Sequence, residues 1–121
     1  MARVLFVDDD PYTLETLHKA VQVFGHEAIL AGSGEDALQK VDEFLPDIIF
    51  IDMRLPDIDG LSVVSQISKG PNTAHIPIFM LSAGSELDAA DNARAAGALE
   101  YLEKPIRLQA LLDIIQKYAM Q

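Results

Sequence analysis

Six of the twelve aspartates in this 121-residue chain lie in two short stretches, each directly after an apolar run. The first stretch is Asp8-Asp9-Asp10, and the second holds Asp52, Asp57 and Asp59. Carboxylates gathered at one place repel each other by several kcal/mol per close pair at an effective dielectric constant of about 20, unless a cation compensates them. The chain has no cysteine. Oxygen ligands alone favour a hard cation, and a small ligand set that retains water favours Mg²⁺ over Ca²⁺.

The acidic residues differ in the chemistry we expect of them. Asp52 continues an apolar strand, and a carboxylate in that position beside Mg²⁺ can attack a phosphoryl group to form an aspartyl phosphate. Such a reaction needs a hydroxyl and a cation nearby, which Ser82 and Lys104 could supply from the ends of two later strands. Three aspartates are expected to cap helices, the usual role of such loop residues: Asp10, Asp57 and Asp59.

Short apolar runs alternate with amphipathic segments along the whole chain. The predicted strands are residues 4–7, 28–31, 48–51, 76–81 and 99–102. Apolar residues spaced by three and four predict a helix after each of them, as in Leu14, Leu17, Val21 and Phe24. Asp10-Pro11 is typical of a helix start, and the alanine-rich fourth helix, residues 85–96, is expected to pack most loosely because it buries little apolar area.

This alternation predicts a flavodoxin-like (βα)5 fold of the α/β class, with helices on both faces of a five-stranded parallel sheet. The continuous apolar runs 4–7 and 48–51 indicate central strands, and the more polar run 99–102 indicates an edge strand. These assignments give the strand order 2-1-3-4-5. The topological switch point then lies between the first and third strands, at the carboxyl ends where the acidic residues, Ser82 and Lys104 should meet.

Length and charge limit the classes of protein to consider. We expect residues 1–121 to form a single domain. A formal net charge of −10 disfavours direct binding to nucleic acid or to an anionic membrane. No apolar run approaches the length of a membrane span, and the N-terminal run is too short for a signal-peptide core. A cytoplasmic location is the default expectation.

Four segments, in this order and at this spacing, resemble the receiver domain of two-component response regulators. They are LFVDDDP at 5–11, IDMRLPDIDG at 51–60, LSA at 81–83, and Lys104-Pro105. The resemblance covers the whole chain. It implies that Asp52 is the phosphoacceptor and that Mg²⁺ is bound by Asp8, Asp9, Asp52 and the backbone carbonyl of Arg54. It also implies that Ser82 and Lys104 bind the phosphoryl oxygens, that Ser82 and Tyr101 form the switch, and that the Lys104-Pro105 bond is cis.

The resemblance further implies a phosphorelay switch with no separate substrate, so that the chain catalyses only its own phosphorylation and dephosphorylation. The donor would be a histidine kinase or a histidine phosphotransfer protein. Phosphorylation would alter binding through the fourth helix, fifth strand and fifth helix, to a downstream protein, a fused output domain or a second copy of the chain. Arg54 and Gly84 are expected to slow hydrolysis of the aspartyl phosphate. Both a complete single-domain regulator and a piece of a longer protein remain open.

Three alternatives share parts of this pattern. A phosphatase of the haloacid-dehalogenase type would also use Asp52 with Mg²⁺, but such enzymes resemble a pattern with a second aspartate where this chain has Arg54. A flavodoxin-like cofactor binder would need a phosphate-binding loop where Asp8-Asp9-Asp10 would repel phosphate. A receiver-like scaffold that is never phosphorylated would not need the complete set of acceptor, acidic pair, hydroxyl and lysine.

Overall fold

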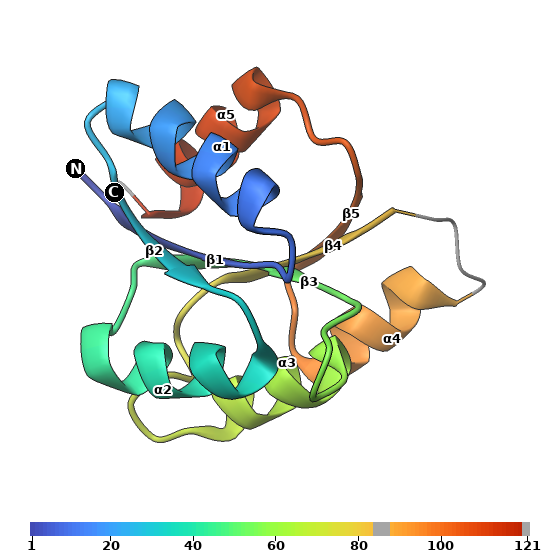
Figure 1. Cartoon of the computed structure of the whole chain (residues 1–121). Helices are drawn as coiled ribbons and strands as arrows, with labels where there is room; N and C mark the ends of the chain where they lie inside the picture. The colour runs from blue at the N-terminus through green and yellow to red at the C-terminus, as the bar shows by residue number, and fades with distance from the viewer. Residues whose placement is uncertain (84–87, 120–121) are drawn as a thin grey trace.

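The computed structural model describes residues 1–83 and 88–119 and contains one parallel sheet (Figure 1). The elements, in chain order, are β1 (Arg3–Val7), α1 (Pro11–Val23), β2 (Glu27–Ala31), α2 (Gly34–Phe44), β3 (Ile48–Asp52), α3 (Gly60–Lys69), β4 (Ile78–Ser82), α4 (Ala89–Ala96), β5 (Glu100–Glu103) and α5 (Leu108–Ala119). The strand order is β2-β1-β3-β4-β5, so the predicted flavodoxin-like topology is confirmed. As expected, β3 and β1 lie inside the sheet and β5 lies at an edge.

Helices cover both faces of the sheet. In Figure 1, α1 and α5 lie on one face, and α2, α3 and α4 lie on the other. Because successive residues of a strand point to opposite faces, each central strand contributes to two separate cores. On the α1 and α5 side, the rings of Phe6, Phe50 and Phe79 stack across β1, β3 and β4 with centroids 5.6 and 5.4 Å apart.

Two helix ends follow the sequence signals. The Asp10 carboxylate accepts a hydrogen bond from the backbone N–H of Tyr12, with Pro11 as the first helical residue of α1. Gly97 ends α4 with φ at 124°, a backbone conformation that glycine adopts without strain. We predicted the fourth helix over residues 85–96, but α4 begins at Ala89, and Asp88 before it has a left-handed backbone at φ 65°. Residues 85–87 of the prediction, and Gly84 before them, lie outside the described residues.

Two apolar residues differ from the helical pattern. We predicted Phe24 on the buried face of the first helix, but α1 ends there and the side chain is 56% exposed. Leu45 ends α2 in the left-handed region, at φ 45°, and is also half-exposed. Helical periodicity does not show where a helix stops, and both side chains lie at the stop.

The fourth strand starts later than predicted. We placed its start at residue 76, but β4 begins at Ile78. Pro77 has no N–H to donate, so the pairing with β3 begins through its carbonyl, which accepts from the N–H of Ile49. Over the described ranges, none of the helices has the length and apolar character that a membrane crossing requires.

Candidate functional site

Strand register brings the predicted site residues to one edge of the sheet. Val7 pairs with Ile51, so the next residues, Asp8 and Asp52, leave neighbouring strands side by side. Asp52 pairs in turn with Leu81, which precedes Ser82 at the end of β4. These three side chains therefore reach the carboxyl edge of the sheet from β1, β3 and β4.

Three of the aspartates form a cluster there. Asp8, Asp9 and Asp52 each offer a carboxylate oxygen, and these oxygens lie within 4.8 Å of one another. Asp8 is buried, Asp52 is partly buried and Asp9 is exposed. Asp10 does not join the cluster, because its carboxylate binds the first turn of α1 through the Tyr12 N–H and the Thr13 hydroxyl.

Lys104 places a positive charge against this cluster. Its Nζ atom lies 2.6 Å from Asp8 Oδ2 and 3.4 Å from Asp52 Oδ2. The other oxygen of Asp8 accepts a hydrogen bond from the backbone N–H of Asp10 at 2.9 Å. The backbone of Lys104 is fixed as well, since its N–H donates to the Ser82 carbonyl at 2.7 Å. The lysine ammonium is thus the counter-ion of the two less exposed carboxylates.

Burial and charge shift the pKa values of this pair. Burial raises the pKa of Asp52 above its ordinary value, and the nearby Lys104 charge only partly offsets that effect. Burial alone would lower the pKa of Lys104, but the hydrogen bond to Asp8 and the charge of Asp52 outweigh it, and the net pKa is raised. Lys104 therefore stays protonated at neutral pH and remains a cation in the site.

A hollow of about 310 Å³ opens beside Asp52. Its lining residues are Asp52, Arg54, Ser82, Ala83 and Lys104. Ser82 is buried and Arg54 is exposed at the rim, where its backbone N–H donates to Asp52 Oδ1 at 3.3 Å. The Lys104-Pro105 peptide bond is cis, as expected. The hollow thus brings the Asp52 carboxylate, a hydroxyl-bearing residue and a cation to one small volume.

Tyr101 lies apart from the hollow, on the edge strand β5. Its ring is half-buried and packs against the core on the α2, α3 and α4 side of the sheet. Its expected movement during switching stays a prediction.

The remaining two aspartates cap helices, one of them in an unexpected way. Asp59 caps its own helix, α3, by accepting from the Leu61 N–H. Asp57 instead accepts hydrogen bonds from the backbone N–H groups of Gly34 and Glu35, at the start of α2. These bonds lower the pKa of Asp57 below its ordinary value. Sequence reasoning predicted a capping role but could not identify the helix, since the partners lie more than twenty residues away.

The donor set fits a hard divalent cation. Oxygens that share one Mg²⁺ ion at about 2.1 Å each lie no more than about 4.2 Å apart. The carboxylate oxygens of Asp8, Asp9 and Asp52 lie within 4.8 Å of one another, which is close to that limit. A small inward movement of one carboxylate, or a water between one carboxylate and the ion, would allow all three to bind it. The described residues offer only carboxylates to this cluster, with neither imidazole nor thiolate among its ligand atoms. Such a set favours Mg²⁺ over softer metals.

The fold and site define a flavodoxin-like α/β protein whose carboxylates, hydroxyl and ammonium converge at the switch point of the sheet. The family model of the response regulator receiver domain matches residues 4–116, and the chain belongs to this family. Receiver domains of two-component systems are phosphorelay switches rather than enzymes of the usual kind, and they typically bind Mg²⁺ at an acidic pocket.

Individual relatives agree with this assignment. The chain is 37% identical over 114 residues to the transcriptional regulatory protein ZraR of Salmonella typhimurium, a match that covers 94% of this chain and 25% of ZraR. The chain thus spans only a quarter of that relative's length. It is 29% identical to protein PilH of Pseudomonas aeruginosa over 95% of each chain. The chemotaxis protein CheY4 of Vibrio cholerae has a crystal structure that matches with a TM-score of 0.90, at 29% identity and over 98% of each chain.

Proposed function

We propose that residues 1–121 act as one receiver unit that is phosphorylated on Asp52 by a phosphohistidine donor in the presence of Mg²⁺. One observation carries this proposal. Asp52 lines the 310 Å³ hollow, the Lys104 ammonium lies 3.4 Å from its carboxylate, and the carboxylates of Asp8 and Asp9 lie beside that of Asp52. A phosphoryl group entering this hollow would meet a nucleophile and a counter-charge together.

In the transfer step, a carboxylate oxygen of Asp52 attacks phosphorus as the bond from phosphorus to the imidazole nitrogen breaks. The electron pair of that bond returns to the imidazole nitrogen. Because the other ring nitrogen of the donor is protonated before transfer, the donor histidine leaves as neutral imidazole. Lys104 and the Ser82 hydroxyl would bind the phosphoryl oxygens. When bound by Asp8, Asp9, Asp52 and the Arg54 carbonyl, Mg²⁺ supplies positive charge for the phosphoryl oxygens. To reset the switch, a water molecule attacks the phosphorus of the aspartyl phosphate and the bond from phosphorus to the Asp52 oxygen breaks, which releases inorganic phosphate and the free carboxylate.

A second hollow beside the site supports a protein donor. This hollow, about 420 Å³ in volume, lies between the first turns of α1 and the turn formed by Lys104, Pro105 and Ile106. Its wall is largely apolar, with Leu17, Leu81 and Ile106. The apolar hollow borders the acceptor site through Lys104, and a histidine kinase or histidine phosphotransfer protein could bury a side chain there while presenting its phosphohistidine to Asp52.

The output surface we propose is formed by α4, β5 and α5. Lys104 follows β5 directly, and Ser82 ends the neighbouring strand β4, so contacts with a phosphoryl group would act at the base of this surface. Tyr101 and the half-exposed Leu99 lie on it. A downstream protein, a fused output domain or a second copy of the phosphorylated chain would bind this surface.

The test is phosphorylation of the purified chain. Incubation with acetyl phosphate or a phosphorylated histidine kinase and Mg²⁺ should add one phosphoryl mass, with the linkage labile as expected of an acyl phosphate. Asp52→Asn should abolish this uptake. Uptake at an undiminished rate by Asp52→Asn, or an acid-stable linkage, would show that the acceptor lies elsewhere. A chain that takes up no phosphoryl group under any of these conditions would favour the scaffold alternative.

The phosphatase alternative predicts a different result. Enzymes of the haloacid-dehalogenase type should hydrolyse phosphate esters with many turnovers, whereas a receiver becomes phosphorylated once and loses the group. The position of a second catalytic acid is occupied here by Arg54, whose side chain is exposed at the rim of the hollow. Sustained hydrolysis of p-nitrophenyl phosphate would overturn the receiver proposal.

A further inference from the structure

The first turn of α2 is bound by a loop that lies far along the chain. The Gly34 N–H donates to Asp57 Oδ1 at 2.8 Å, and the Glu35 N–H donates to Asp57 Oδ2 at 2.9 Å. The first N–H groups of a helix have no partner within it, so a carboxylate that accepts two of them is held firmly. We call these two hydrogen bonds the Asp57 clamp.

Helix α2 also has a cap of its own. The Ser33 hydroxyl accepts from the Asp36 N–H at 3.1 Å, as an N-cap residue should. The Asp57 clamp is therefore an additional link between α2 and the loop that joins β3 to α3. Helix α2 packs closely on this loop and on α3, because a Cβ atom on Gly34 would lie 3.0 Å from Ile58 Cβ in the loop and 2.9 Å from Val63 Cγ2 in α3.

The clamped loop carries the backbone that the metal site needs. It runs over residues 53–59 and leaves β3 directly after the acceptor. At its start, the Arg54 N–H donates to Asp52 Oδ1. At its end, α3 begins so close to β3 that a Cβ atom on Gly60 would lie 2.6 Å from the Asp52 carbonyl oxygen. Asp57 fixes the loop between these two points, three residues after Arg54.

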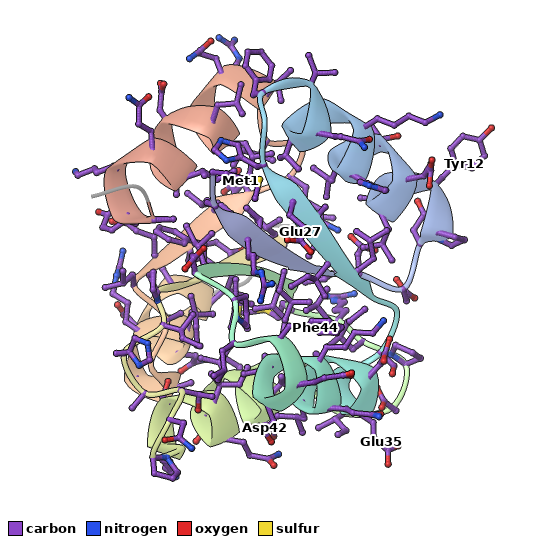
Figure 2. All side chains as sticks on the ribbon, turned by 90° about the vertical axis from the view of Figure 1, so that its left-hand side faces the viewer. Met1, Tyr12, Glu27, Glu35, Asp42 and Phe44 are labelled. Carbon is purple, nitrogen blue, oxygen red and sulfur yellow. The ribbon has the colours of Figure 1, made fainter. Side chains whose placement is uncertain are left out.

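Helix α2 is itself fixed to the sheet, so it can hold the loop in place. The Asp36 carboxylate contacts Lys40 Nζ at 3.2 Å and the Gly32 N–H at 3.3 Å, and Lys40 also donates to the Leu30 carbonyl of β2. Figure 2 shows Glu35 in the first turn of α2 at the same end of the molecule as Tyr12 in the first turn of α1. This is the end that carries the acidic cluster.

We propose that Asp57 is a positioning residue for Mg²⁺: the clamp holds residues 53–59 so that the Arg54 carbonyl faces the cluster of Asp8, Asp9 and Asp52. This inference rests on the proposed function. Without the clamp, the loop must be ordered each time the metal binds, so the affinity for Mg²⁺ falls. Once the metal is bound, the acceptor and its counter-charge are unchanged, so the maximal rate of phosphorylation stays the same.

Four variants separate this effect from its alternatives. Asp57→Ala removes the clamp. Ser33→Ala removes one capping hydrogen bond from the same helix without touching the loop, and serves as the control for stability. Glu35→Gln removes one negative charge beside the clamp while keeping its backbone N–H, and serves as the control for charge. Asp57→Asn retains one acceptor oxygen and should restore part of the effect.

Three measurements are made on each variant and on the unchanged chain. They are the Kd for Mg²⁺ by calorimetry, the Mg²⁺ dependence of phosphorylation by acetyl phosphate, and amide hydrogen exchange of residues 53–59 without metal. We expect Asp57→Ala to raise the Kd about five- to tenfold and to speed exchange in the loop, with Asp57→Asn between it and the unchanged chain. Ser33→Ala and Glu35→Gln should stay within twofold, and the rate at saturating Mg²⁺ should stay within twofold for all.

The outcomes distinguish the clamp from the function on which it rests. If the unchanged chain is phosphorylated on Asp52 but Asp57→Ala binds Mg²⁺ no worse than Ser33→Ala or Glu35→Gln, the positioning role is wrong and the receiver function stands. A lower rate of Asp57→Ala at saturating Mg²⁺ also overturns a purely positioning role. If the unchanged chain takes up no phosphoryl group and binds no Mg²⁺, the proposed function fails and the inference fails with it.

Discussion

Replacement of Lys104 by methionine should destabilise the metal-free protein and strengthen its binding of Mg²⁺ at the same time. The ammonium lies 2.6 Å from Asp8 Oδ2, and at an effective dielectric constant of about 20 this pair is worth about 6 kcal/mol of Coulomb energy. Removing one partner of a buried pair costs about 3–5 kcal/mol. The Lys104 side chain is 25% exposed, so solvent reduces the expected loss to about 2–3 kcal/mol.

This loss converts to a measurable change in melting temperature. Unfolding entropy of about 2.1 cal/mol/K per residue gives about 0.25 kcal/mol/K for 121 residues, so Tm should fall by about 8–12 °C in the presence of a chelator. Saturating Mg²⁺ supplies the missing positive charge and should reduce the difference by at least half. Because the metal no longer competes with the ammonium for Asp8, calorimetry should show about tenfold tighter Mg²⁺ binding, which is about 1.4 kcal/mol.

Thermal melts with chelator and with Mg²⁺ check this prediction. Lys19→Met is the matched control, because it changes the net charge equally at an exposed position whose ion pair with Glu15 spans 3.7 Å. The control should melt within 2 °C of the unchanged chain under both conditions. The reasoning about Lys104 as counter-ion is refuted if Lys104→Met does the same, or if its deficit is equal with and without Mg²⁺.

Three further predictions concern other parts of the molecule. The Nδ1 atom of His26 accepts a hydrogen bond from the Ala2 N–H, and burial, followed by the N-terminal charge, lowers the pKa of this histidine. As pH falls, the unfolded chain therefore binds the proton before the folded chain does. Urea titrations should show that the free energy of unfolding falls by about 1 kcal/mol between pH 7.5 and 5.5, relative to His26→Gln. Arg54→Ala, or Gly84→Glu, should shorten the lifetime of the aspartyl phosphate at least twofold; unchanged decay in both variants would exclude control of the lifetime at these two positions. Beryllofluoride with Mg²⁺ should shift amide resonances in α4, β5 and α5, including Tyr101, and changes confined to α1 and α2 would contradict that output surface.

The sequence was most informative about the site residues that directly follow predicted strands. Asp8 and Asp52 could be placed together because apolar runs predicted two adjacent parallel strands, and parallel strands end at one edge. The bond between Lys104 and Asp8 could not be predicted, since it joins residues 96 positions apart whose approach depends on how the last turn packs. The helix that Asp57 caps was hidden for the same reason. Local patterns predict which groups seek partners, whereas tertiary packing decides which partners they find.

The stack of Phe6, Phe50 and Phe79 gives the site one rigid side and one adjustable side. These rings occupy paired positions on β1, β3 and β4, two or three residues before Asp8, Asp52 and Ser82. Backbone hydrogen bonds hold these three strands side by side, and the stacked rings pack them together into the core on the α1 and α5 side. The fifth strand has no ring in this stack and carries Lys104 at its end. We therefore expect adjustment to a bound group at the edge of the sheet, while Asp8 and Asp52 stay on strands held by the hydrogen-bond ladder and the aromatic stack.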